Sequence, residues 1–310
     1  MKGGGLMSKN SPLIIFLLVS LLSFICVSEG VAQDKLPINS LPEKSKRTIK
    51  GLPEINWADD TIAVDKVIPS LFKGVGRNEI IDSVSVLAPV LEHLRQMRAG
   101  LSEDTVRILH IGDSHIRGHI FPQTTGKLLQ ESFGAVSYTD MGVNGATCLT
   151  FTHEKRIADI AALKPELLIL SFGTNESHNK RYNQKLHYNQ IDELVRLLRD
   201  SLPDVPILLT TPPGSYESFR RRRRRRTYAV NPRTDTVTKT ICRYAREHDL
   251  SVWDMYNLVG GKNYACTNWT GAKLMRPDHV HYLLEGYILQ GNLLYQAFIQ
   301  AYNDYVSHSH

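Results

Sequence analysis

From residue 105 onward, short apolar segments alternate with longer amphipathic ones, and this alternation is the strongest constraint on the fold. The short segments have the length and composition of buried strands, which we predict at 106–111, 136–139, 167–172, 205–210 and 250–254. The longer segments predict helices at 117–133, 155–163, 182–202, 234–248 and 283–305. Strands separated by helices form a parallel sheet that is covered on both faces. The pattern therefore predicts an α/β fold.

Residues 1–30 have the pattern of a secretory signal peptide. Lys2 and Lys9 precede an apolar run from Leu13 to Val27, and small residues follow up to Gly30. The run is shorter than the roughly 20 residues that a membrane-spanning helix needs. We therefore predict cleavage near Gly30, export to the periplasm or the cell exterior, and no transmembrane segment in the mature chain. A retained N-terminal anchor is the alternative.

The region between this signal and the alternating pattern is predicted to carry little regular structure. Residues 31–82 are rich in Pro, Lys, Asn and Asp and lack periodicity, which is typical of a linker or a loosely packed extension. A leading helix is predicted at 89–99, because apolar residues keep helical spacing and Pro89 is tolerated in a first turn. We expect one domain over residues 83–310.

Cysteine usage argues against a chain held together by disulfides and against a zinc site. Cys148, Cys242 and Cys266 remain after the signal, so at most one disulfide forms, and a Cys148–Cys266 bond is the alternative to three free thiols. No cysteine or histidine cluster has the spacing of a zinc site, so we expect no metal and no other cofactor.

The formal net charge of +6 comes from one segment, because Arg220–Arg226 is an unbroken run of seven arginines and the rest of the chain is slightly negative. Adjacent like charges repel, so we predict a solvated loop. Such a run attracts polyanions, which for an exported protein means an acidic wall polymer or a membrane surface. Nucleic acid is not expected as a partner.

A serine follows the first predicted strand, in the segment Ile111-Gly112-Asp113-Ser114-His115. The carboxyl ends of parallel strands are where such sheets bind ligands. Ser114 would lie there at the start of a helix, where backbone N–H groups have no intrahelical partner. A serine so placed can attack an ester and donate to the oxyanion that forms. The alternative is that Asp113 or Ser114 only caps the helix.

Two further motifs follow the next two predicted strands. Gly145 lies in Met141-Gly-Val-Asn-Gly-Ala-Thr147, and Asn175 lies in Phe172-Gly-Thr-Asn-Glu176. The Gly145 N–H and the Asn175 side-chain amide are suitable oxyanion donors. Both segments also have the composition of ordinary turns, which is the alternative reading.

The fourth motif is Pro277-Asp278-His279-Val280-His281, which precedes the last predicted helix. An aspartate three residues before a histidine can bond the ring Nδ1, which leaves Nε2 to accept a proton from a serine. A metal site formed by Asp278, His279 and His281 is the alternative, although it lacks a fourth ligand.

Taken together, the order Ser, Gly, Asn and Asp-x-x-His resembles the SGNH (GDSL) hydrolase family over about residues 106–305. The resemblance implies a three-layer α/β/α sandwich with a five-stranded parallel, flavodoxin-like sheet. It also implies a triad of Ser114, His281 and Asp278, with an oxyanion hole formed by the Ser114 amide, Gly145 and Asn175. The sequence departs from the family pattern at His115, where a leucine is usual, and at Glu176, where an aspartate is usual.

The segments around Ser114 and Gly145 resemble the branch that removes O-acetyl groups from cell-wall glycans, which includes peptidoglycan O-acetylesterases. Val252-Trp253-Asp254, Gly260-Gly261 and Trp269 resemble related proteins exported by Bacteroidetes-type bacteria. This implies an O-acetylated glycan as substrate, with peptidoglycan first. The alternatives are a lipase, lysophospholipase or thioesterase on the same fold, and a non-catalytic glycan-binding wall protein. His115 and Trp269 are candidate substrate contacts, each with a structural role as its alternative.

Overall fold

The structure is a computed structural model that describes residues 60–219 and 227–308. The predicted signal peptide (1–30) and the arginine run (220–226) lie outside these ranges. The strands are β1 (Ile80–Ile81), β2 (Val106–Gly112), β3 (Val136–Gly142), β4 (Leu167–Ser171), β5 (Ile207–Thr210), β6 (Tyr216–Phe219), β7 (Thr227–Val230) and β8 (Ser251–Trp253). The helices are α1 (Ala88–Arg98), α2 (Ser114–Arg117), α3 (Ile120–Phe133), η2 (Cys148–Phe151), α4 (Glu154–Ala162), α5 (Thr174–His178), α6 (Gln184–Ser201), α7 (Arg233–Glu247), α8 (Met255–Leu258), α9 (Gly261–Gly271) and α10 (Leu284–His308).

The central sheet has the strand order β1-β8-β5-β4-β2-β3. Five of these strands run parallel, and in chain order they stand as 2-1-3-4-5, which confirms the flavodoxin-like arrangement. The sixth strand, β1, pairs antiparallel with β8 at the edge and was not predicted. It has only two residues in the sheet, which is too short to show a period-2 pattern.

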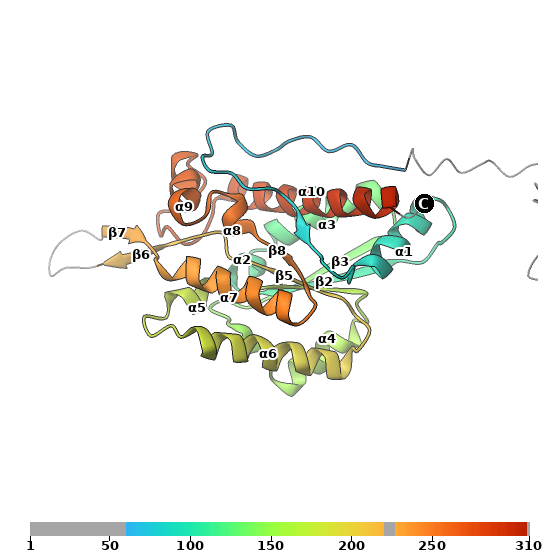
Figure 1. The fold of residues 1–310 in the computed structure, drawn as a ribbon, viewed down its shortest axis with the longest axis horizontal. Coiled ribbons are helices and arrows are strands. Elements are labelled where there is room, and N and C mark those ends of the chain that lie inside the picture. Colours follow the sequence, from blue (N-terminus) through green and yellow to red (C-terminus); the bar gives the residue numbers. More distant parts are fainter. Residues whose placement is uncertain (1–59, 220–226, 309–310) are drawn as a thin grey trace, which may run out of the picture. The chain divides into compact units, whose positions relative to one another are not determined.

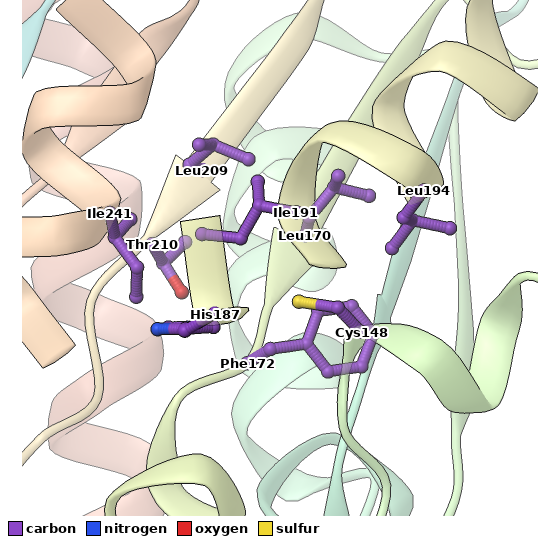
Figure 2. Close-up of a pocket in the computed structure, with 9 residues that line it drawn as sticks. All are labelled: Cys148, Leu170, Phe172, His187, Ile191, Leu194, Leu209, Thr210 and Ile241. Atoms are coloured by element: carbon purple, nitrogen blue, oxygen red, sulfur yellow. The ribbon is translucent and has the colours of Figure 1, made fainter. Parts of the chain in front are cut away.

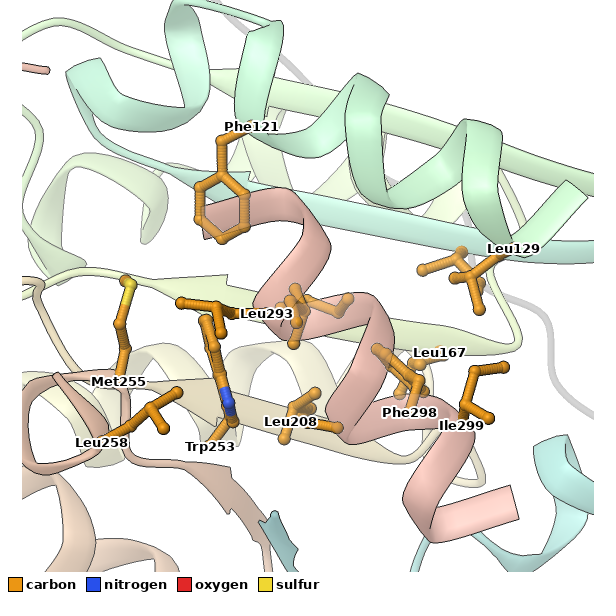
Figure 3. Close-up of a cluster of buried hydrophobic side chains, with 14 of the residues drawn as sticks. Phe121, Leu129, Leu167, Leu208, Trp253, Met255, Leu258, Leu293, Phe298 and Ile299 are labelled. Atoms are coloured by element: carbon orange, nitrogen blue, oxygen red, sulfur yellow. The ribbon is translucent and has the colours of Figure 1, made fainter. Parts of the chain in front are cut away.

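Helices cover both faces of the sheet, as the α/β/α prediction requires (Figure 1). Alternate residues of one strand enter different cores: Ile108 of β2 packs with α1, α3 and α10, whereas its neighbour Leu109 packs with α4, α6 and α7. The first core also contains Trp253 and Phe298, shown with their neighbours in Figure 3. Strands with apolar side chains on both faces are stable only when both faces are covered.

Within the predicted extension, residues 60–82 contact the domain at several points. The Ile62 N–H donates to Asn303 Oδ1 at 2.8 Å, and Asn78 Nδ2 donates to the Leu293 carbonyl at 2.8 Å. Phe72 is buried, with its ring centroid 5.3 Å from that of Trp269. These contacts join residues about 200 positions apart, so local periodicity cannot reveal them.

Helix α9 is the largest element that the sequence analysis missed, since residues 261–271 were expected as loop. Its buried face consists of Gly261, Ala265, Cys266, Asn268 and Trp269, and the glycine and the polar asparagine interrupt the apolar stripe that would reveal an amphipathic helix. The predicted helix 117–133 is also divided into α2 and α3, because His119 adopts a left-handed conformation with φ 65°.

Within residues 60–219 and 227–308, no helix has both the length and the apolar composition needed to cross a membrane. Cys148, Cys242 and Cys266 are free thiols, so the alternative of a Cys148–Cys266 disulfide is not realised.

Candidate active site

The candidate nucleophile lies between the end of β2 and the start of α2. The Asp113 carboxylate caps α2 by accepting from the His115 N–H at 2.9 Å, which fixes the turn that presents Ser114. Gly142 at the end of β3 lets this turn approach closely, because a Cβ there would lie 2.0 Å from the Arg117 backbone nitrogen.

Ser114, His281 and Asp278 form a continuous hydrogen-bonded chain. Ser114 Oγ lies 2.9 Å from His281 Nε2, and His281 Nδ1 lies 3.0 Å from Asp278 Oδ2. The other oxygen, Asp278 Oδ1, accepts from the backbone N–H groups of Val280 (2.8 Å) and His281 (2.9 Å). This geometry places the Nδ1 proton on the aspartate side and leaves Nε2 able to accept the serine proton.

The Asp278 carboxylate is held in its ionised form. Its partial burial raises the pKa, but the hydrogen bonds from the His281 and Val280 amides and from the His281 ring outweigh burial, and the pKa lies below its ordinary value. An ionised partner at Nδ1 stabilises the imidazolium that forms when Nε2 takes a proton.

The three predicted oxyanion donors come from three adjacent strand ends. Ser114 is the first residue of α2, Gly145 follows β3 with φ 73°, and Asn175 lies in α5 after β4. Asn175 Nδ2 donates one hydrogen to the Ala146 carbonyl at 2.8 Å. That bond orients the amide and leaves its second hydrogen for a ligand. The strand order β3-β2-β4 therefore brings all three donors to the same edge of the sheet.

Glu176 joins two of these segments, a role that the sequence analysis did not assign. Its Oε1 accepts from the Cys148 N–H at 3.0 Å and its Oε2 from the Gly173 N–H at 2.9 Å. The side chain is buried, and burial raises its pKa against the opposing effect of these amides. The carboxylate thus ties the loop that carries Gly145 to the turn that carries Asn175.

The Ser114 hydroxyl and the His281 ring line an open cleft of about 500 Å³. Its other lining residues are Arg117, Gly118, Ile120, Asn144, Arg276 and Tyr287. Of these, only Ile120 and Tyr287 offer large apolar surface.

The structure does not place the two predicted substrate contacts in this cleft. Trp269 is 0% exposed in α9, where its Nε1 donates to the Pro213 carbonyl at 3.0 Å. His115 is buried behind Ser114, with Nδ1 3.1 Å from the Tyr287 hydroxyl, and burial lowers its pKa to about 3. Both side chains have structural roles, because neither reaches the cleft surface.

A small cavity of about 10 Å³ lies behind the nucleophile, and Asp113, His115 and Gln290 are among its lining residues. His115 Nε2 and both amide atoms of Gln290 are buried without a protein partner among the described residues. Burial raises the Asp113 pKa to about 7.

Cys148, Glu176 and His187 form the one group of three buried metal-ligand types in the described ranges, with ligand atoms within 4.8 Å of one another. Cys148 and His187 also line a cavity of about 20 Å³ whose other walls are mainly apolar (Figure 2). Structural zinc sites use four protein ligands, whereas this group supplies three. Both Glu176 oxygens are already engaged with amides, so the group fits a metal poorly.

The alternative metal site at Asp278, His279 and His281 is not formed. Asp278 and His281 bond each other, while the His279 ring turns away and packs against Tyr228, with centroids 4.2 Å apart. His279 therefore belongs to the contact between the catalytic loop and the β6–β7 hairpin, where the Tyr216 N–H donates to the His279 carbonyl at 2.9 Å.

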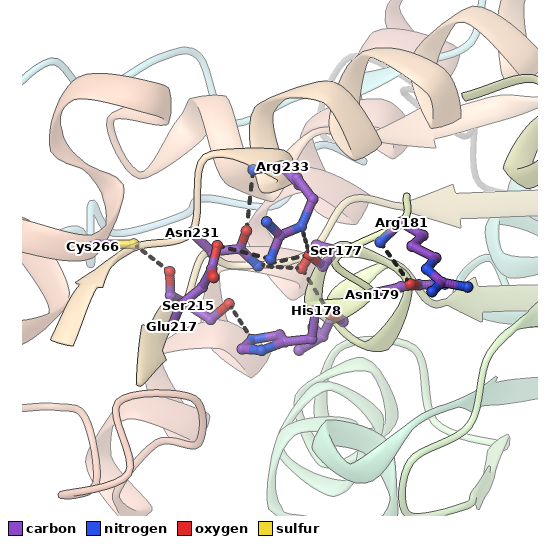
Figure 4. Close-up of polar contacts among 10 residues, drawn as sticks. Ser177, His178, Asn179, Arg181, Ser215, Glu217, Asn231, Arg233 and Cys266 are labelled. Carbon is purple, nitrogen blue, oxygen red and sulfur yellow. Dashed lines mark hydrogen bonds and ion pairs between the residues drawn. The ribbon is translucent and has the colours of Figure 1, made fainter. Parts of the chain in front are cut away.

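The base of that hairpin is anchored to α5 and α7 by the polar contacts in Figure 4. His178 Nε2 lies 2.9 Å from Ser215 Oγ, and Asn231 Nδ2 donates to the Ser177 carbonyl at 3.0 Å. An ion pair of 2.7 Å joins Arg233 to Glu217. The two strands that flank the arginine run are thus fixed beside the catalytic loop.

Comparisons with solved structures identify a protein of similar fold. The fold is similar to that of a solved protein described as a peptidoglycan O-acetylesterase in action, with a TM-score of 0.64, 18% identity, and coverage of 73% of this chain and 99% of that chain. A GDSL-like lipase from Bacteroides thetaiotaomicron gives a TM-score of 0.45 and 19% identity, covering 69% of this chain and 99% of its own. A solved acetyl esterase variant with an acetate ion gives a TM-score of 0.48 and 15% identity, covering 64% of this chain and 99% of its own.

No curated protein matches the sequence. The model of the GDSL-like lipase/acylhydrolase family matches residues 110–288, which is more than half of the chain and includes every residue of the site described above. The protein therefore belongs to the GDSL-like lipase/acylhydrolase family.

Proposed function

We propose that the protein is an exported serine esterase that removes O-acyl groups, in particular O-acetyl groups, from a polysaccharide, with peptidoglycan as the first candidate. The observation that carries the proposal is the contact of 2.9 Å between Ser114 Oγ and His281 Nε2, with Asp278 on the far side of the ring. Family membership supports acyl-ester hydrolysis as the class of reaction.

In the proposed reaction, Ser114 Oγ attacks the ester carbonyl while His281 Nε2 takes its proton. The carbonyl oxygen becomes an oxyanion that accepts hydrogen bonds from the Ser114 and Gly145 N–H groups and from Asn175 Nδ2. The sugar hydroxyl leaves with the proton from His281, and Ser114 remains acylated. Water then attacks the acyl-enzyme by the same route and releases the carboxylic acid. Each oxyanion donor lowers the barrier by roughly 3–4 kcal/mol.

Two observations support a glycan ester over a lipid. The cleft at Ser114 is open, and Ile120 and Tyr287 are the only large apolar side chains that line it among the described residues. Such a surface suits a polymer that lies across the cleft and a short acyl group. The likeness in fold to a peptidoglycan O-acetylesterase supports the choice of glycan.

The direct test is acetate release from O-acetylated peptidoglycan, compared with release from acetylated xylan. We expect release by the wild type and a loss of at least about 1,000-fold in Ser114→Ala. p-Nitrophenyl esters of increasing chain length distinguish an acetylesterase from a lipase or lysophospholipase, because a lipase or lysophospholipase would prefer long acyl chains. An absence of turnover on every ester, with glycan binding retained, would instead indicate a non-catalytic wall protein.

We also propose export through the signal at residues 1–30 and a contact between Arg220–Arg226 and an acidic polymer. Replacing the seven arginines by Gln or Ser should weaken binding to an anionic glycan at low salt more than hydrolysis of a small ester. An equal loss of both would contradict a separate binding role. Cell fractionation tests export, which recovery of the full-length chain in the cytoplasm would refute.

A further inference from the structure

We infer that the catalytic cleft contains an anion subsite formed by Arg117 and Arg276, and that the substrate is an acyl ester on a carboxylate-bearing glycan. This inference rests on the proposed function and narrows its substrate class. Both arginines line the same cleft of about 500 Å³ as Ser114 and His281.

Each arginine is built into one of the two segments that supply the reacting groups. Arg117 follows Ser114 by three residues in α2 and so lies one turn away on the same helix. Arg276 begins the loop that carries Asp278 and His281, where its backbone N–H donates to the His281 carbonyl at 2.8 Å. The positions of both cations are therefore fixed relative to the scissile bond.

The Arg117 guanidinium is oriented by two side chains behind it. Arg117 Nη1 donates to His119 Nε2 at 2.6 Å, and His119 Nδ1 lies 2.5 Å from Asp140 Oδ1. His119 makes this contact from a left-handed backbone conformation, φ 65°, that a non-glycine residue rarely adopts. This contact uses one N–H of Arg117, whose side chain is exposed, and leaves its other donors for a ligand.

Arg276 is held in a similar way, since its Nε donates to the Tyr282 carbonyl at 3.0 Å. Its two terminal nitrogens remain available for a bidentate contact with a carboxylate. Among the described residues, no ion pair joins Arg117 or Arg276 to an Asp or Glu. The nearby charge of Asp278 is directed to the His281 ring and to two backbone amides.

The charge balance of the cleft follows from these contacts. The cleft has two guanidinium groups and no acidic residue in its lining, and Asn144 adds a neutral polar group. A substrate that carries a carboxylate near its ester gains two charge-assisted hydrogen-bonding partners, whereas a neutral glycan leaves both cations without one. Two sources supply such a carboxylate: the uronic acids of an acidic polysaccharide and the peptide stems of peptidoglycan.

The test compares kcat/KM for acetate release from three O-acetylated polymers: polygalacturonate, peptidoglycan and neutral xylan. We expect the wild type to prefer an anionic polymer, and we expect Arg117→Gln with Arg276→Gln to lower the ratio of anionic to neutral kcat/KM by at least ten-fold. The polymer whose ratio falls further identifies the source of the carboxylate. Arg117→Lys with Arg276→Lys should restore part of the ratio, and Arg196→Gln, an exposed arginine on α6, is the matched control.

An unchanged ratio in the double Gln variant would overturn the inference. A second measurement separates this outcome from failure of the proposed function. The inactive Ser114→Ala protein should bind oligogalacturonate at 20 mM salt, and the two Gln substitutions should weaken that binding at least ten-fold. Retained binding would refute the subsite. Loss of binding through the two Gln substitutions, together with no ester hydrolysis by the wild type, would support the subsite and refute the esterase.

Discussion

Glu176 provides the sharpest test of how the oxyanion site is held together. Its two carboxylate oxygens accept from the Cys148 and Gly173 amides at 3.0 and 2.9 Å, so each oxygen has a backbone donor in front of it. Glu176→Gln keeps the shape of the side chain but replaces one oxygen by NH₂, which faces an N–H group. Either orientation of the amide therefore breaks one of the two bonds and leaves a buried donor without an acceptor.

The size of the effect follows from that broken bond. A hydrogen bond to a charged group contributes about 1.5–3 kcal/mol, and an unsatisfied buried donor adds a desolvation cost of similar size. We expect Glu176→Gln to lower the free energy of unfolding by about 3 kcal/mol. The loop that carries Gly145 also loses its tie to α5, so we expect kcat to fall about ten-fold with a smaller change in KM.

Urea unfolding and the hydrolysis of p-nitrophenyl acetate measure the two effects. The matched control is Glu193→Gln, an exposed glutamate on α6, which should change stability by less than about 0.5 kcal/mol. A Glu176→Gln protein with the stability and kcat of the wild type would refute the role of Glu176 as a clamp.

Three further changes test other parts of the site. Asp278→Asn removes the ionised partner of His281 and should lower kcat about 10²- to 10⁴-fold with KM little changed; activity above a tenth of the wild type would contradict the triad. Burial raises the Asp113 pKa from 3.8 to about 7, so an aspartate at this position costs stability as the pH rises between about 4 and 7. The unfolding free energy of Asp113→Asn relative to wild type, from urea titrations, should therefore increase over this range by up to about 4 kcal/mol, and a constant difference would refute the shift. Gln290→Leu removes a buried side-chain amide that has no protein partner among the described residues, so the variant should be as stable as the wild type or more stable, and a loss of more than about 1 kcal/mol in urea unfolding would contradict this reading.

The parallel strands and the long helices could be predicted because their apolar patterns are local. β2 and β4 are short apolar runs, and α6 has an apolar stripe that matches the helical period. The edge strand β1 and the helix α9 could not be predicted in this way. Their residues are placed by contacts with distant segments, and the buried face of α9 includes a glycine and an asparagine, which weaken its apolar stripe.

The candidate site shows the same difference between features with a local sequence pattern and features that depend on distant contacts. Ser114, Gly145, Asn175 and His281 follow predicted strands or precede the last helix, and the sheet brings them to one edge. Trp269 was misplaced because an aromatic residue in an expected loop looks accessible, whereas the helix that contains it buries it completely.

The sequence analysis missed the roles of Glu176, Arg117 and Arg276 for a different reason. Glu176 acts on an amide 28 positions away, which no local pattern indicates, although its departure from the usual aspartate was visible. Arg117 and Arg276 resemble ordinary surface arginines until the fold places them in one cleft.

The most direct test of the central claim is covalent trapping of the nucleophile. The protein would be incubated with a fluorophosphonate, digested and analysed by mass spectrometry. A single adduct on Ser114, strongly reduced in His281→Ala, is the predicted result, because the activated hydroxyl requires the imidazole 2.9 Å away. Labelling of a different residue, or unchanged ester hydrolysis in Ser114→Ala, would contradict the assignment.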